Sequence, residues 1–420
     1  MPRFQRPTGT LDILPEDQPY WYHVRGRARH LAEMAGFERL DIPMFESTGL
    51  FARGVGSGTD IVDKEMYSFR DKGDHDITLR PEFTAGMLRA YIENGMRVRT
   101  QPVKIYTFGS LFRYERPQAG RFRQHTQFDV EIIGDQDPAA DLEVMLLAWD
   151  LYADLGFHAL AFQLNSTGCP ACKPGYISAL KAYYAQHATV ICEDCQRRLE
   201  RSPLRVLDCK AGRCQAVIEG APHIMDHLCG ECAEHFGTLR EYLAVMERCY
   251  TINHRLVRGL DYYTKTVFEV WAAGIGAQSA VCGGGRYDGL AELLGGPATP
   301  GVGFGSGIER IIMVMKGLKV EVPALQRPLV YLAHLGAEPK RYALRLAESL
   351  RLGGVATWTA FGSRGLKSQL REAGRRGVRY AVILGENELV SGVAQVRDMA
   401  GGTQMSVSLD ELSTWVVARL

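Results

Sequence analysis

Two strand-rich blocks of this chain are separated by a block that is mainly helical and rich in cysteine. Strand patterns around turns fill residues 77–134 and resume over residues 257–307, whereas residues 165–255 hold nine of the ten cysteines. A chain of 420 residues exceeds what one hydrophobic core usually spans, so two or three domains are expected. We therefore interpret the cysteine-rich block as an insertion.

Composition and charge limit the class of protein. Hydrophobic residues make up 46% and charged residues 23%, which is typical of a soluble globular protein. The net charge of +1 means that any contact with nucleic acid must come from a local basic patch. There is no apolar run long enough for a transmembrane helix and no N-terminal signal peptide, so we expect a cytoplasmic protein without a membrane partner. Cysteines in that compartment are expected to be thiols or metal ligands.

The N-terminal segment predicts a long helix followed by a strand. Apolar residues recur at helical spacing over residues 19–35, and Gly36 is placed to end that helix. Residues 37–42 then alternate as a strand, and Pro43 ends the strand or lies at its edge. Taken alone, this is an ordinary helix–strand unit.

The last part of the chain has a separate pattern of predicted strands and helices. Residues 329–420 alternate between short apolar strands and amphipathic helices, which predicts a small α/β domain. Residues 321–328, with Pro323 and Pro328, are expected to form a linker. Basic residues repeat at helical spacing in this part, at positions Arg364, Lys367, Arg371 and Arg375.

A strict two-residue alternation marks one strand as a candidate site. Residues 127–132 place Gln127, Asp129 and Glu131 on one face and three apolar residues on the other. Two carboxylates and an amide beside the arginine-rich residues 113–123 could bind an ammonium or imidazole group. For the arginines, the alternative is a solvated hairpin.

The run from Arg258 to Tyr263 combines a fixed positive charge with two adjacent phenols. Such a run suits a pocket that holds an anion and a small planar polar group together. The alternative is a buried strand and turn with a core tyrosine pair.

These segments resemble histidyl-tRNA synthetases. Arg258–Tyr263 and residues 279–288 resemble the two histidine signatures of that family. Residues 19–43, 112–125 and 301–310 resemble motifs 1, 2 and 3 of class II aminoacyl-tRNA synthetases, and the tail resembles their anticodon-binding domain. The implied fold is α+β, with an antiparallel catalytic sheet flanked by helices, a helical insertion and a C-terminal α/β anticodon-binding domain.

The resemblance also implies domain boundaries, partners and a reaction. The catalytic domain would comprise residues 1–164 and 256–320, interrupted by the insertion at 165–255 and followed by the linker at 321–328 and the anticodon-binding domain at 329–420. Motif 1 forms the dimer interface in the family, so a homodimer is expected. The enzyme would activate L-histidine with ATP and Mg²⁺ and then charge a histidine tRNA. Motif 2 would meet the acceptor end of that tRNA, and the basic face of the tail could meet its anticodon stem-loop.

Individual roles follow from the matching positions. Arg258 and Arg113 would be the catalytic residues that flank the α-phosphate and the histidine carboxylate. ATP would be bound by Arg113, Glu115, Arg121 and Arg310. Histidine would be bound by Glu82, Thr84, Gln127, Glu131, Tyr262 and Tyr263.

The cysteine pairs suggest zinc. Three C-x-x-C pairs and a looser fourth pair can present eight thiolates, enough for two tetrahedral sites whose pairing the sequence leaves open. Alternatively, the cysteines fill small cores as free thiols, since the family as a whole does not require zinc. Zinc would be structural here, because the activation chemistry is complete without it. The candidate ligands are Cys169, Cys172, Cys192, Cys195, Cys209, Cys214, Cys229 and Cys232.

Two other functions share parts of this pattern. One is a catalytically silent, histidine-binding regulatory paralogue that partners an ATP phosphoribosyltransferase. The other is a synthetase-like module that senses uncharged tRNA. Arg113, Arg258, Arg310 and the C-terminal tail are all retained here, which favours the ligase.

Overall fold

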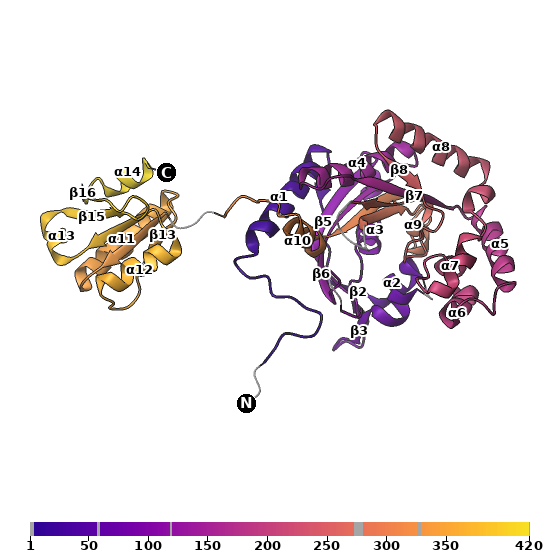
Figure 1. Cartoon of the computed structure of the whole chain (residues 1–420), viewed down its shortest axis with the longest axis horizontal. Coiled ribbons are helices and arrows are strands. Elements are labelled where there is room, and N and C mark those ends of the chain that lie inside the picture. Colours follow the sequence, from indigo (N-terminus) through magenta and orange to yellow (C-terminus); the bar gives the residue numbers. More distant parts are fainter. Residues whose placement is uncertain (1–3, 57–58, 118–119, 273–279, 326–328, 420) are drawn as a thin grey trace. The chain divides into compact units, whose positions relative to one another are not determined.

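A computed structural model describes residues 4–56, 59–117, 120–272, 280–325 and 329–419 (Figure 1). The chain divides into two compact units, residues 1–322 and 323–420, and each is described by itself. Ser279 of the second signature and residues 326–328 of the expected linker lie outside the described residues. Within the described part, no helix is both long and apolar enough to cross a membrane.

The first unit is built on an eight-stranded sheet. Its two outer pairs, β1–β5 and β7–β8, are parallel, and all other neighbours are antiparallel. The expected antiparallel catalytic sheet is therefore confirmed. The strands are, in spatial order, β1 (Glu38–Arg39), β5 (Val103–Phe112), β6 (Gln124–Ile133), β11 (Gly301–Gly307), β10 (Ala280–Arg286), β9 (Thr264–Trp271), β7 (Ala161–Gly168) and β8 (Tyr250–Ile252).

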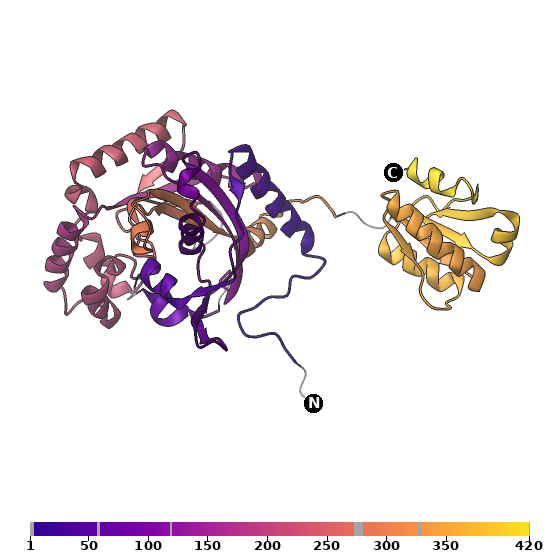
Figure 2. The ribbon, with the colours of Figure 1, turned by 180° about the vertical axis from the view of Figure 1, so that it is seen from behind.

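One face of this sheet is buried under helices. Apolar side chains of β6, β9 and β11, such as Val130, Phe268 and Phe304, form a single core with helical residues such as Trp21 and Leu151. The turned view of Figure 2 shows the same ribbon from behind. Burial of this continuous apolar face holds the helices on the sheet. These helices are α1 (Gln18–Met34), α4 (Pro138–Asp154), α8 (Gly230–Val245) and α10 (Ile308–Gly317).

The N-terminal helix agrees with its prediction, but the strand after it is shorter than predicted. β1 contains only Glu38 and Arg39, although the amide of Leu40 still donates to the Tyr106 carbonyl at 2.9 Å. Pro43 has no N–H to continue this pairing, and the chain passes to a different sheet. That small antiparallel sheet has the order β2 (Phe45–Ser47), β4 (Asp76–Leu79) and β3 (Tyr67–Arg70), with helix α2 (Thr48–Val55) beside it.

The buried Arg80, which directly follows β4, connects the small sheet to the main sheet. The Arg80 guanidinium donates to the carbonyls of Ile42 at 2.6 Å, Pro43 at 3.1 Å and Ser110 at 3.0 Å. These three bonds fix the residues that follow, which lead into α3 (Thr84–Glu93). α3 and the short helix α9 (Leu290–Leu293) contact each other.

Helices occupy most of the chain between β7 and β8. They comprise α5 (Lys173–Ala185), α6 (Glu193–Arg201), α7 (Gly212–Glu219) and α8. The first three share a small core of their own, in which Tyr184, Leu180 and Ile218 pack with cysteine side chains.

The second unit confirms the expected C-terminal α/β domain. β12 (Val330–His334) pairs in parallel with β13 (Thr357–Thr359) and β14 (Tyr380–Leu384), and β15 (Val393–Asp398) and β16 (Gln404–Ser408) continue the sheet as an antiparallel hairpin. Separate apolar clusters cover the two faces of this sheet. The helices are α11 (Ala337–Leu352), α12 (Leu366–Arg376), α13 (Glu386–Ser391) and α14 (Leu412–Val417).

Because β10 and β11 pair closely, a single methyl group added at Gly284 should strongly destabilise the protein. A Cβ at Gly284 would lie 2.1 Å from the Gly303 carbonyl oxygen, so Gly284→Ala requires a backbone shift. We expect it to lower the free energy of unfolding by about 1–3 kcal/mol or more, measured by denaturant titration. Gly237→Ala in α8, where a Cβ would meet open space, should instead stabilise the protein by about 0.5–1 kcal/mol. A Gly284→Ala protein as stable as wild type would contradict this strand pairing.

Candidate active site

The polar face of the main sheet forms the floor of a small cavity. The cavity has a volume of about 110 Å³, and its walls come from the segment before α3 and from residues 258–263. Cavities with a few convergent polar groups are the usual form of small-molecule sites. The lining residues are Glu82, Phe83, Thr84, Arg113, Gln127, Asp129, Glu131, Arg258, Leu260, Tyr262, Tyr263, Gly283, Tyr287, Gly303, Phe304 and Gly305.

Glycines on β10 and β11 make room for the polar side chains of neighbouring segments. A Cβ at Gly303 would lie 1.7 Å from Glu131 Oε2, and a Cβ at Gly305 would lie 2.2 Å from Gln127 Nε2. A Cβ at Gly283 would lie 2.4 Å from a terminal nitrogen of Arg258. The floor is therefore bare backbone, over which these side chains lie.

Three carboxyl groups, those of Glu82, Asp129 and Glu131, are buried against this floor, each 3% exposed or less. Glu131 accepts hydrogen bonds from the Thr84 hydroxyl at 2.7 Å and the Tyr287 hydroxyl at 2.6 Å. Glu82 accepts from the Ala85 amide at 3.0 Å and the Tyr262 hydroxyl at 3.4 Å. Asp129 accepts from the side-chain amide of Gln127, so each carboxyl group is held in a fixed orientation.

Burial of these groups changes their titration. It raises the pKa of Asp129 to about 8, with Glu82 adding to the rise, and it raises the pKa of Glu131 well above its usual range. Burial also raises the pKa of Glu82. A cationic group in the cavity would offset this cost and favour the ionised forms. The cavity therefore suits an ammonium or imidazolium group.

Two arginines supply the opposite charge. Arg258 donates to Glu269 Oε1 at 2.6 Å, and Glu269 also accepts from the Trp271 indole at 3.0 Å. Arg113 donates through its Nε to the Pro81 carbonyl at 2.8 Å. Both guanidinium groups are therefore oriented by fixed partners while they line the cavity.

Most of the predicted site residues meet in this cavity, but Glu115, Arg121 and Arg310 do not line it. Glu115 and Arg121 form an ion pair at 3.5 Å in the hairpin loop between β5 and β6. Burial and the nearby Arg121 guanidinium lower the pKa of Arg310, so α10 brings Arg310 close to that loop. A Cβ at Gly120 would touch Met313 of α10 at 3.2 Å, which agrees with this arrangement.

Two residues at the site, Tyr287 and Glu269, were not assigned a role from the sequence. The alternation did identify Asp129 as one of two carboxylates of a possible ammonium or imidazole site, and Asp129 lines the cavity. Tyr287 lies within the second signature run, but only the fold reveals its bond to Glu131. Glu269 follows Arg258 by eleven positions, a spacing that carries no signal on its own.

The cysteines of the insertion form two groups of four. One group contains Cys169, Cys172, Cys229 and Cys232, and the other contains Cys192, Cys195, Cys209 and Cys214. Within each group the four sulfur atoms lie within 4.8 Å of one another. The pairing that the sequence left open is thus defined by the fold.

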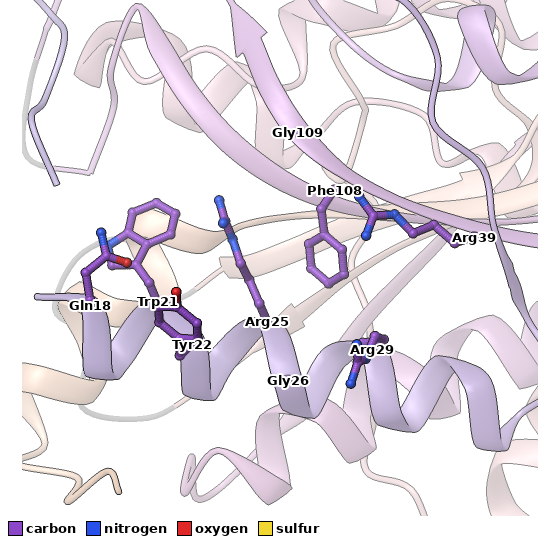
Figure 3. A pocket seen from close by; sticks show the side chains of 9 residues that line it. All are labelled: Gln18, Trp21, Tyr22, Arg25, Gly26, Arg29, Arg39, Phe108 and Gly109. Carbon is purple, nitrogen blue, oxygen red and sulfur yellow. The ribbon is translucent and has the colours of Figure 1, made fainter. Parts of the chain in front are cut away.

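A second hollow, of about 460 Å³, lies outside the active site (Figure 3). Figure 3 shows Trp21, Tyr22, Arg25 and Arg29 along α1, facing Phe108 and Arg39 from the edge of the main sheet. Tyr22 is 65% exposed. An aromatic and cationic hollow of this kind is typical of an interface.

The antiparallel sheet and its cavity define a class II aminoacyl-tRNA synthetase fold. Residues 9–311 match the histidyl-tRNA synthetase family model, and residues 329–419 match the anticodon binding domain model. The chain belongs to the histidyl-tRNA synthetase family.

Similar proteins extend over the full length of the chain. Histidine–tRNA ligases of Dehalococcoides mccartyi strain 195 and Desulforamulus reducens are 51% and 48% identical; the first match covers 97% of this chain and 98% of the relative, and the second covers 99% of each. The crystal structure of apo Staphylococcus aureus histidyl-tRNA synthetase aligns with a TM-score of 0.83 and 35% identity over 99% of this chain and 100% of that one. A Bacillus halodurans structure described as an ATP phosphoribosyltransferase regulatory subunit/histidyl-tRNA synthetase aligns with a TM-score of 0.62 over 91% of this chain and 98% of that one. At 20% identity it shows a shared fold only.

The raised pKa of Asp129 predicts a pH-dependent stability. The pKa rises from an ordinary 3.8 to about 8, so the folded protein binds more protons than the unfolded chain between these values. The contribution of Asp129 to the free energy of unfolding therefore falls as pH rises through this window. Asp129→Asn should gain stability relative to wild type between pH 5 and about pH 8, by denaturant titration.

The exposed Glu234→Gln variant is the control for this experiment, and its difference from wild type should stay constant over the same range. A constant difference for Asp129→Asn as well would mean that Asp129 is ionised in the folded protein throughout.

Proposed function

We propose that this chain is a histidine–tRNA ligase, which joins L-histidine to ATP as histidyl-adenylate and then transfers histidine to the 3′ end of its tRNA. The observation that supports this most directly is the cavity in which buried carboxyl groups face two oriented arginines across a glycine floor. It offers a cation-binding side and an anion-binding side within one small volume. A zwitterionic amino acid next to a phosphate group requires both.

The relatives favour the ligase over the regulatory alternative. The full-length relatives described above, at 51% and 48% identity, are named histidine–tRNA ligase, whereas the regulatory description occurs at 20% identity. Residues 329–419 also match an anticodon-binding domain, which a regulatory paralogue would not need.

Histidine would lie against the acidic side of the cavity. Glu82 would supply the countercharge for the α-ammonium group, next to the Thr84 hydroxyl. Gln127, Glu131 and the phenols of Tyr262 and Tyr263 would bind the remaining polar atoms, including the imidazole nitrogens. The buried carboxyl groups support this arrangement, because a cationic ligand lowers the cost of their ionisation.

Activation then requires positioning and charge neutralisation. A histidine carboxylate oxygen attacks the ATP α-phosphorus in line, a new P–O bond forms, and the bond to pyrophosphate breaks. Arg258 and Arg113 would flank the α-phosphate and the carboxylate, so that both anions meet fixed positive charge. Arg258 is already oriented by Glu269 and so needs little reorganisation.

The rest of ATP would lie over the glycine floor and toward the β5–β6 loop. Arg121, Arg310 and Glu115 would bind the nucleotide there, and Mg²⁺ would neutralise the outer phosphates. The proximity of Arg310 to Arg121 supports this, because two guanidinium groups held close together favour a polyanion between them.

The tRNA would meet both units. Its acceptor end would approach the β5–β6 loop, and its anticodon stem-loop would contact the exposed Lys367, Arg371 and Arg375 on α12. The sequence pattern placed Arg364 on the same helical face, but Arg364 precedes α12 and pairs with Glu372 at 2.7 Å. The exposed basic face therefore comprises Lys367, Arg371 and Arg375, without Arg364.

Each four-cysteine group would bind a structural Zn²⁺ ion. Tetrahedral Zn²⁺ with Zn–S bonds of about 2.3 Å requires sulfur atoms about 3.8 Å apart. The Sγ atoms of Cys169 and Cys172 are 3.8 Å apart, as are those of Cys192 and Cys209. These separations are far longer than a disulfide bond of about 2.05 Å.

We further propose that the enzyme acts in the cytoplasm, where its tRNA substrate is found.

Removing Arg258 should abolish activation. We expect Arg258→Ala to lower histidine-dependent ATP–pyrophosphate exchange by about 10²–10³-fold or more, because a fixed donor to the reacting centre is lost. Arg240→Ala, at an exposed arginine of α8, is the matched control and should retain exchange. Near-normal exchange by a folded Arg258→Ala protein would disprove the role of Arg258.

The hollow on α1 should be covered by a second copy of the chain. We expect a homodimer, and Tyr22→Glu should weaken it by about tenfold or more, because a charge would be buried in the interface. Sedimentation velocity over a concentration series measures this change. Val245→Glu, at a side chain 79% exposed on α8, is the control and should remain dimeric. A monomeric wild-type protein at micromolar concentration would contradict the proposed interface.

A further inference from the structure

The run from Arg255 to Lys265 carries Arg258, Tyr262 and Tyr263 into the active site, and each of its ends is held next to a four-cysteine group. We propose that the two zinc sites position this run, so that the metal ions control the affinity of the enzyme for histidine. The inference rests on the histidine site and the zinc sites proposed above.

The first cysteine group holds the end of the run through both of its pairs. Lys173, which follows Cys172 directly, donates to the carbonyl of Tyr263 at 3.2 Å and to that of Asp261 at 3.5 Å. Glu231, which lies between Cys229 and Cys232, pairs with Lys265 at 2.8 Å. A metal that joins the two cysteine pairs would therefore fix both contacts at once.

The second cysteine group holds the start of the run through one amide side chain. Gln215, which follows Cys214, donates to the carbonyl of Cys209 at 2.8 Å. Its oxygen accepts a hydrogen bond from Arg255 at 2.6 Å. The bond to Cys209 depends on the loop that closes the second group, so loss of that metal would release Arg255.

Backbone amides donate to sulfur atoms in both groups. In the first group, the Cys169 amide donates to Cys172 Sγ at 3.2 Å. In the second group, the Cys192 amide donates to Cys214 Sγ at 3.2 Å, and the Ala211 amide donates to Cys209 Sγ at 3.4 Å. These bonds orient the sulfur atoms within each group.

The backbone at Lys265 shows why this run needs support. Lys265 has φ +48°, a left-handed conformation that a non-glycine side chain disfavours, and the β7–β9 pairing is irregular beside it. Such a conformation persists only where the surroundings enforce it. Glu231 pairs with Lys265 itself, and Lys173 holds the carbonyls of Asp261 and Tyr263 just before it. These contacts enforce the conformation when both cysteine pairs are joined.

The test compares anchor variants that leave every zinc ligand intact. Lys173→Ala and Gln215→Ala should retain two zinc ions per chain by elemental analysis. In histidine-dependent ATP–pyrophosphate exchange, each should raise KM for histidine by about fivefold or more, while kcat and KM for ATP stay within about twofold. Lys181→Ala and Gln186→Ala, at exposed positions of the same helical region, are the matched controls and should leave all three values unchanged. Unchanged KM for histidine in both anchor variants would overturn the proposal.

A spectroscopic measurement on the holoenzyme tests the metal directly. With Co²⁺ in place of zinc, titration with histidine should change the visible absorption of the thiolate-bound ion, and titration with alanine should not. A chain that takes up neither Zn²⁺ nor Co²⁺, or a cobalt spectrum that is insensitive to saturating histidine, would overturn the inference.

A variant of the histidine site distinguishes failure of the histidine-site assignment from failure of the metal inference. Glu131→Gln should raise KM for histidine regardless of the metal. If it does not, the histidine-site assignment fails; if it does and the anchor variants behave as wild type, only the metal inference fails.

Discussion

The active site depends on the pairing of β6, β11 and β10. Glycines on β10 and β11 leave space for the polar side chains of the site to lie across the sheet. In the antiparallel register, Gly305 is opposite both Asp129 and Gly283, and Gly303 is opposite Glu131. The side chains of Glu131 and Gln127 fill the space that a Cβ on β11 would take. The positions of the Asp129 and Glu131 carboxyl groups are thus set by backbone pairing and not by loop conformation.

A second constraint joins this sheet to the helices behind it. Arg286 of β10 is fully buried and donates to Asp141 of α4, whose other oxygen lies 3.3 Å from His235 of α8. Breaking a buried ion pair of this kind strongly destabilises a protein, because the remaining charge is left buried without a partner or solvent. It ties α8, which begins next to a cysteine of the first group, to the strand that carries the glycine floor.

Much of the site could be predicted because it lies on regular strands or in long signature runs. The two-residue alternation of β6 identified the polar face, and the run at Arg258 identified the opposite wall. Other features depend on contacts between distant segments. The bond of Tyr287 to Glu131 and the assembly of Cys169 with Cys229 join residues far apart in sequence, so local patterns do not contain them. The strand after α1 was predicted too long, because alternation does not reveal where Pro43 directs the chain into another sheet.

Because burial keeps a proton on Asp129, the binding of a cationic ligand is coupled to proton release. A cation that enters the cavity favours the carboxylate, so at neutral pH binding expels a proton into the solvent. The observed heat of association then includes the ionisation heat of the buffer. The ligand affinity should also strengthen as the solution becomes more alkaline toward the pKa of the free site. The same buried carboxyl group that reduces the stability of the empty protein thereby couples amino acid capture to the proton concentration of its surroundings.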